Sequence, residues 1–86
     1  MIQLSIANDF SKTPGVRYPE EGEFSGQQFR EEILKPKVDE AISKKAKLEI
    51  DLDGTSGLGP SFLEEAFGGL IRGGYDYGQL MRIFVF

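Results

Sequence analysis

The sequence contains no cysteine, no histidine and no tryptophan. The lack of cysteine excludes disulfides, thiolate metal sites and cysteine nucleophiles. The lack of histidine excludes Ser–His catalysis and leaves zinc with carboxylate ligands only, which is an uncommon arrangement. No apolar run approaches the ~20 residues of a membrane span, and residues 1–5 lack the basic region and apolar core of a signal peptide. We therefore expect a cytoplasmic chain with no cofactor and no membrane partner.

What the chain does have is a globular composition with an acidic balance. Its 86 residues are enough for one domain, which we expect to span residues 1–86. Hydrophobic residues make up 40% and charged residues 28%, a mixture that can bury a core and argues against disorder. The formal net charge of −4 repels phosphate backbones, so we expect a protein partner and no nucleic acid. Small domains often gain stability by pairing, which leaves a homo-oligomer open.

Five segments have the patterns of secondary structure. Apolar and polar residues alternate over residues 2–6 and 48–53, as in half-buried strands. Residues 81–86 are apolar apart from one arginine, which predicts a strand well inside the sheet, since an exposed edge of this composition would aggregate. Residues 25–45 and 61–72 have apolar residues at helical spacing.

Both predicted helices begin with a serine that is followed three residues later by glutamine or glutamate. This spacing predicts capping boxes at Ser25 and Ser61. Pro36 lies inside the first helix and predicts a kink there, or two short helices. Gly68 and Gly69 lie inside the second, where each costs about 1 kcal/mol relative to alanine. They indicate that this helix approaches a neighbouring element closely.

The order of elements is β–loop–α–β–α–β, which implies right-handed crossovers and a largely parallel sheet. Because two of the strands alternate in polarity, helices should cover mainly one face of the sheet. We therefore predict an α/β, two-layer fold. It would have a mainly parallel sheet of about four strands, with two principal helices packed mostly on one face.

One alternative function depends on residues 51–55, Asp-Leu-Asp-Gly-Thr. They resemble the first motif of the haloacid-dehalogenase-like phosphotransferases, in which two aspartates act around magnesium. Asp51 and Asp53 would then bind Mg²⁺ and attack phosphorus. That family's later lysine and second acidic pair are missing, since no lysine follows Lys47. We therefore expect a protein that is not an enzyme and holds no metal.

A second alternative is a small-anion or nucleotide site in the glycine-rich loop from Gly54 to Gly59. A loop between strand and helix can cradle an anion at the helix start. A Walker loop needs lysine where this chain has Pro60, and a dinucleotide fingerprint starting at Gly57 needs glycine where it has Phe62. The pattern favours an ordinary turn over anion binding.

Several stretches resemble the STAS-like family of uncharacterised bacterial and phage domains. Two of them flank the glycine loop: residues 48–53, Leu-Glu-Ile-Asp-Leu-Asp, and residues 59–70, Gly-Pro-Ser-Phe-Leu-Glu-Glu-Ala-Phe-Gly-Gly-Leu. Two more lie upstream, residues 15–17 (Gly-Val-Arg) and 22–30 (Gly-Glu-Phe-Ser-Gly-Gln-Gln-Phe-Arg). The most specific part is the Ser-Phe-Leu-x-Glu-Ala-Phe-Gly-Gly-Leu run. The resemblance implies a STAS-like fold, related to the anti-sigma-factor antagonists.

In those antagonists, a strand and loop precede a serine or threonine at a helix start, which a histidine-kinase-like ATPase phosphorylates. Placing their strand on Leu48 without gaps puts the phosphorylated serine on Ser61. The neighbouring positions differ, because their aspartate, first serine and following glycine fall on Gly59, Pro60 and Phe62. The resemblance implies a regulatory protein–protein interaction domain for signalling, with an ATPase of that kind as partner.

The surface expected to dock this partner is the end of the loop and the first helical turn: Gly57, Leu58, Gly59, Pro60, Ser61 and Phe62. Ser61 has two interpretations, an N-cap worth about 1 kcal/mol and a phosphoacceptor that gains a charge of about −1.5 to −2. The cap is the commoner role for such a serine. Phe62 is either a partner contact or, as its apolar stripe favours, part of the core.

Three arginines, Arg17, Arg30 and Arg72, are candidate forks for phosphate or carboxylate groups. Their ordinary interpretation is surface charge.

Overall fold

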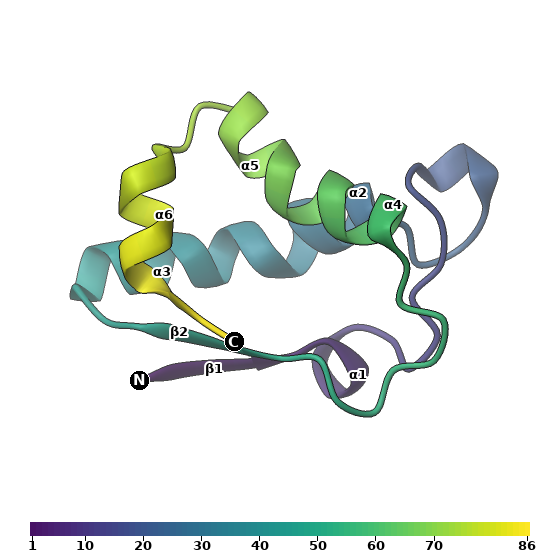
Figure 1. Ribbon diagram of the computed structural model, residues 1–86, viewed down its shortest axis with the longest axis horizontal. Helices are drawn as coiled ribbons and strands as arrows, with labels where there is room; N and C mark the ends of the chain where they lie inside the picture. Colours follow the sequence, from purple (N-terminus) through teal and green to yellow (C-terminus); the bar gives the residue numbers. More distant parts are fainter.

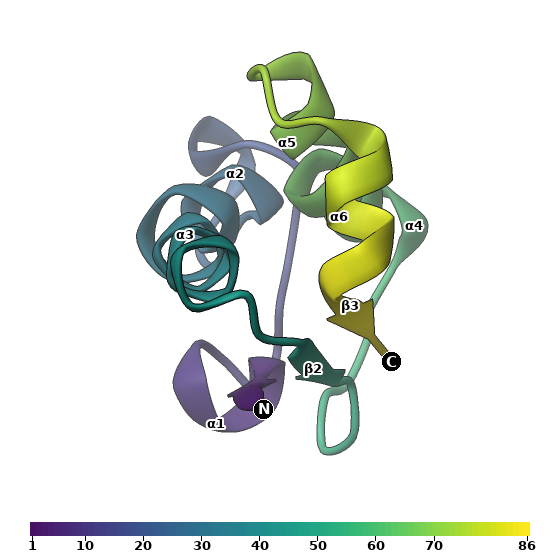
Figure 2. The same cartoon turned by 90° about the vertical axis from the view of Figure 1, so that its left-hand side faces the viewer.

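A three-stranded parallel sheet forms one layer of the molecule, with its first two strands labelled in Figure 1 and its third in Figure 2. The computed structural model describes all 86 residues. The strands, in their order across the sheet, are β1 (Ile2–Ser5), β2 (Leu48–Asp51) and β3 (Phe84–Val85). Leu48 pairs with Ile2 on one side and with Phe84 on the other, so β2 is central. The predicted parallel α/β fold is confirmed, but the sheet has three strands rather than about four.

The two principal helices and the C-terminal helix form a second layer that lies over this sheet, whereas the short helix that follows β1 lies at the end of that strand (Figure 2). The long helix consists of α2 (Gly26–Phe29), a π-helical segment (Arg30–Leu34) and α3 (Lys35–Lys44). The facing helix consists of α4 (Pro60–Leu63), a π-helical segment (Glu64–Gly68) and α5 (Gly69–Arg72). The shorter elements are α1 (Ile6–Asp9), a 3-10 turn (Pro19–Glu21) and α6 (Tyr77–Ile83). None of these helices has the length and apolar character that crossing a membrane requires.

The core lies between the two layers, on one face of the sheet, as the alternation predicted. Leu4 and Ile50 point into it from neighbouring strands, whereas Gln3 and Glu49 form a hydrogen bond of 3.1 Å on the opposite face. The buried cluster comprises Leu4, Ile6, Phe29, Leu34, Val38, Ala41, Leu48, Ile50, Phe62, Ala66, Leu70, Leu80 and Ile83. Three helices therefore cover the sheet, because α6 contributes to the core beside the two principal ones.

Pro36 does not break the long helix, because the turn before it is widened. The backbone amide of Lys35 donates to the carbonyl of Arg30, five residues earlier, as in a π-helix. In a regular α-helix the proline ring would clash with the carbonyl of Glu32. The wide turn relieves this clash. The predicted kink is thus a local widening within a continuous helix.

The C-terminal segment differs most from its prediction. Asp76 caps α6 by accepting the backbone amide of Gln79 at 2.8 Å, and the helix then continues to Ile83. Only Phe84 and Val85 form a strand, and it lies at the edge of the sheet. The prediction of an interior strand over residues 81–86 is therefore wrong. The first half of this apolar run, residues 81–83, belongs to the capped helix α6 instead.

Candidate functional site

The loop between β2 and α4 begins at the carboxyl end of the central strand (Figure 1). Its middle is held by two hydrogen bonds. The Thr55 hydroxyl donates to the carbonyl of Leu52 at 2.9 Å, and the Ser56 amide donates to the carbonyl of Lys12 at 2.8 Å. Gly57 has a φ of 74°, which favours glycine at this position. The loop is thus anchored to the N-terminal part of the chain before it enters α4.

Ser61 lies at the start of α4 and is exposed, but it is not the helix cap. Gly59 occupies the N-cap position, and Pro60 is the first helical residue, for which its fixed φ is suited. The predicted capping box at Ser61 is therefore wrong, because the helix starts two residues earlier than the pattern indicated. The predicted cap at Ser25 is confirmed, since its hydroxyl accepts the amide of Gln28 at 3.0 Å. The Ser61 hydroxyl has no such bond.

Most of the predicted docking surface is accessible. Its exposed or half-buried residues are Gly57, Leu58, Gly59, Pro60 and Ser61. Phe62 is fully buried and packs against the ring of Phe29 at a centroid distance of 5.6 Å. Phe62 is therefore a core residue, and the candidate surface is limited to residues 57–61.

Asp51 and Asp53, the alternative magnesium ligands, form a turn at the end of β2. A carboxylate oxygen of Asp51 accepts the amide of Asp53 at 2.8 Å, which is an Asx turn. Both side chains line an open pocket of about 250 Å³ together with Glu49, Ile50 and Phe86. Nowhere in the chain do three or more metal-ligating side chains converge. The Asp51 side chain thus stabilises the turn, and Asp53 contributes its backbone amide to it.

The three arginines converge on one buried carboxylate. Arg30 donates to the carboxylate of Glu65 at 2.7 Å and to its backbone carbonyl at 2.5 Å. Arg17 and Arg72 each lie 3.4 Å from the other carboxylate oxygen. The Glu65 side chain is only 7% exposed. These arginines are therefore carboxylate forks, and they stabilise a charge that burial would otherwise disfavour.

Glu65 was not singled out from the sequence, although a signal was present. It lies three residues after Phe62 and directly before Ala66, on the stripe that faces the core. A charged residue at such a position needs a partner, because an unpaired buried charge is costly. The three candidate arginines were the partners available.

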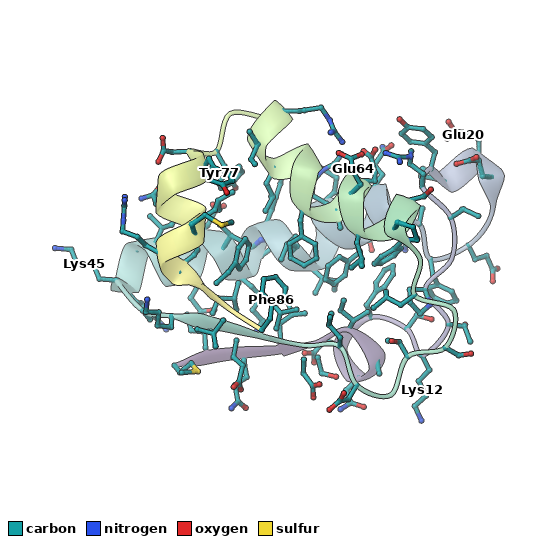
Figure 3. All side chains as sticks on the ribbon, viewed as in Figure 1. Lys12, Glu20, Lys45, Glu64, Tyr77 and Phe86 are labelled. Atoms are coloured by element: carbon teal, nitrogen blue, oxygen red, sulfur yellow. The ribbon has the colours of Figure 1, made fainter.

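Glu64 is the exposed neighbour in the same network (Figure 3). It accepts hydrogen bonds from Arg17 and, at 2.5 Å, from Arg72. These bonds, that of Arg72 first, lower the pKa of Glu64 to about 2. Burial acts to raise the pKa of Glu65, but the hydrogen bond and charge of Arg30 outweigh it, so this pKa is lowered too. Both carboxylates are held in their charged form.

Two glycines allow the two principal helices to approach closely enough for this network. A Cβ atom on Gly26 would lie 2.6 Å from the carbonyl oxygen of Phe62. A Cβ atom on Gly69 would overlap the guanidinium group of Arg30. The predicted close approach is thus confirmed at Gly69. At Gly68 the nearest group is instead the Glu64 side chain of the same helix.

The network predicts a loss of stability in acid. The Glu64 pKa is about 2 in the folded chain, whereas glutamate titrates near 4.3 when unfolded. A lowered folded pKa contributes stability above about pH 4.3 that is lost as the pH falls toward 2. The midpoint of urea unfolding should therefore decrease over this range. Glu64→Gln should make that decrease shallower, and an equally steep decrease in the variant would contradict the assignment.

These features together describe a small α/β domain with an exposed strand–loop–helix junction over a buried ionic network. The sequence model of one family, described as a STAS-like domain of unknown function, matches residues 25–80. This chain belongs to that family, and the resemblance noted from its motifs is confirmed. The matched range includes Ser61, Glu65 and Arg30 but not Arg17. No curated protein and no solved structure matches the chain.

Proposed function

We propose that the chain is a non-catalytic regulatory module that docks a protein partner through residues 57–61. The observation that carries this proposal is that Ser61 is exposed and does not cap the helix. Its side chain is free of any structural hydrogen bond, on a helix start that follows an anchored loop. A serine needed for capping would be occupied by the backbone, whereas this one is available. Membership of a STAS-like family supports a role resembling that of the anti-sigma-factor antagonists.

Phosphorylation of Ser61 would act through Arg17. A phosphate adds a charge of about −1.5 to −2, one helical turn before Glu64. It is a strong acceptor and would compete with Glu64 for the Arg17 guanidinium. Arg17 lies in a segment whose carbonyls accept the amides of Gly26 and Gln27 at the start of α2. Modification would thus change both the charge of the docking surface and the loop beside it.

The test uses a purified histidine-kinase-like ATPase, the kind of partner that the family resemblance implies. Calorimetry would compare Ser61→Glu with Ser56→Glu, a matched control because Ser56 is an exposed serine of the same loop. We expect Ser61→Glu to change the affinity by about tenfold, which corresponds to about 1.4 kcal/mol, and Ser56→Glu to leave it unchanged. Both variants should keep the melting temperature of the wild type, since neither hydroxyl is a helix cap.

Phosphate transfer from ATP should label the wild type and not Ser61→Ala, with the label located by mass spectrometry. Equal affinities for the wild type and Ser61→Glu would contradict the docking surface. Labelling of Ser61→Ala to the same extent would contradict the phosphoacceptor while leaving docking intact.

A further inference from the structure

The outer edge of β3 is apolar and has no neighbour. The strand is bonded to β2 on one side only. Tyr77 and Met81, four residues apart on one side of α6, are 61% and 48% exposed, and Phe86 is 70% exposed. Half of the chain's six exposed large hydrophobic residues thus belong to this segment. Figure 3 shows Tyr77 and Phe86 on the same face of the molecule. Natural edges are usually short, charged or covered; this edge is short, but its apolar side chains are left exposed.

The two ends of this edge carry opposite charges. Where β2 and β3 begin, Lys45, Lys47 and Arg82 line an open pocket of about 260 Å³ whose wall contains no carboxylate. None of these three cations forms an ion pair; Lys47 donates to the backbone carbonyl of Arg82 instead. Where β2 ends, the carboxylates of Asp51 and Asp53 likewise have no cation beside them. The pairing of charges seen elsewhere in the chain is missing at both ends.

We propose that the β3 edge pairs with the β3 edge of a second copy of this chain, antiparallel and about a two-fold axis. An antiparallel pairing places the basic end of each copy against the acidic end of the other. Opposite charges therefore face each other at both ends of the paired edges. A parallel pairing would instead bring like charges together. The product is a continuous sheet of six strands in which Tyr77, Met81 and Phe86 of both copies are shielded from water.

Distances along the sheet are compatible with this arrangement. Neighbouring strands lie about 4.8 Å apart, so Arg82 of one copy starts roughly 10 Å to the side of the turn that holds Asp51 and Asp53 in the second copy. An arginine side chain spans much of that distance, and charges interact over about 8–10 Å at physiological salt. The edge is short, with two residues in β3, so the dimer belongs to the weak class of interfaces.

Sedimentation of the whole chain at low salt, from micromolar to millimolar concentration, tests the proposal. The weight-average mass should rise from 9.6 kDa toward twice that value and stop there. Arg82→Glu and Asp53→Arg should each weaken dimerisation about tenfold, and the double variant should restore it, because the swapped charges again match across the axis. Lys12→Glu makes the same change of charge in an exposed lysine outside this surface and should have no effect.

A chain that remains monomeric at millimolar concentration would overturn the proposal, and the edge would then belong to another partner. Growth beyond the dimer would overturn the two-fold arrangement. A double variant as weak as the single ones would overturn the pairing of Arg82 with Asp53. Circular dichroism of each variant separates these outcomes from loss of folding, which is not expected because both residues are exposed.

Discussion

Replacing Glu65 with alanine should lower the free energy of unfolding by about 3 kcal/mol, at the lower end of what removing one partner of a buried ion pair costs. The reason is the state in which Arg30 is left. Its side chain is only 13% exposed and donates to the Glu65 carboxylate at 2.7 Å. Without that carboxylate, the guanidinium would stay desolvated and would lose its buried partner. Arg30 would keep its bond to the backbone carbonyl of residue 65 and its ion pair with the exposed Glu31 at 2.9 Å, which limit the loss.

Urea unfolding followed by circular dichroism measures this difference. Glu64→Ala is the matched control, because Glu64 is adjacent in sequence, contacts two of the same arginines and is exposed. Exposed ion pairs contribute little, so this variant should remain much closer to the wild type. Glu65→Gln keeps an acceptor for Arg30 and should fall between the two. Equal stabilities of Glu64→Ala and Glu65→Ala would show that the Glu65 carboxylate is not the centre of the network.

Replacing Gly26 with alanine should lower the free energy of unfolding by about 2 kcal/mol, a typical cost of overpacking a close contact. The added Cβ would lie 2.6 Å from the carbonyl oxygen of Phe62 and 3.0 Å from the Cβ of Glu65. Both contacts involve atoms that cannot rotate away, so α2 and α4 would have to move apart. That movement would also lengthen the bonds between Arg30 and Glu65.

Gly78→Ala is the control for this second prediction. Gly78 is also helical, but its Cβ would lie 3.3 Å from the capping oxygen of Asp76 and 3.6 Å from the guanidinium of Arg82, and it would meet no backbone atom of another element. Alanine is favoured over glycine in helices by up to about 1 kcal/mol, so this variant should be as stable as the wild type or slightly more stable. A Gly26→Ala protein with unchanged stability would mean that the two helices do not cross as closely as described.

The parts of the fold that local patterns determine could be predicted from the sequence. The alternation over residues 2–6 and 48–53 identified β1 and β2, and the Ser25 cap placed the start of α2 correctly. The short length of β3 could not be predicted, because apolarity alone does not distinguish a strand from a helix. Its edge position could not be predicted either, because apolarity does not give the order of the strands in the sheet. The start of α4 differs from the Ser61 pattern because Pro60, whose fixed φ suits the first helical position, begins the helix two residues earlier.

The sequence predicted which residues belong to the site, but not which of them contact one another. The strand–loop–helix junction, Ser61 and the three arginines were identified from residue types, which the sequence displays directly. Their convergence on Glu65 depends on how the two principal helices cross. That crossing depends on Gly26 and Gly69, which lie 43 residues apart in the sequence, and no periodicity connects them. Contacts of this kind are set by tertiary packing.

The two π-helical segments have a consequence for chain length. Buried residues on the long helix are five apart across the wide turn, from Phe29 to Leu34, and four or three apart beyond it, at Val38 and Ala41. The wide turn thus takes up one extra residue while the flanking turns keep the same side toward the core. A relative shorter by one residue within either segment would retain both buried faces. A one-residue deletion anywhere else in these helices would rotate the remainder of the helix by about 100° and turn core residues toward water.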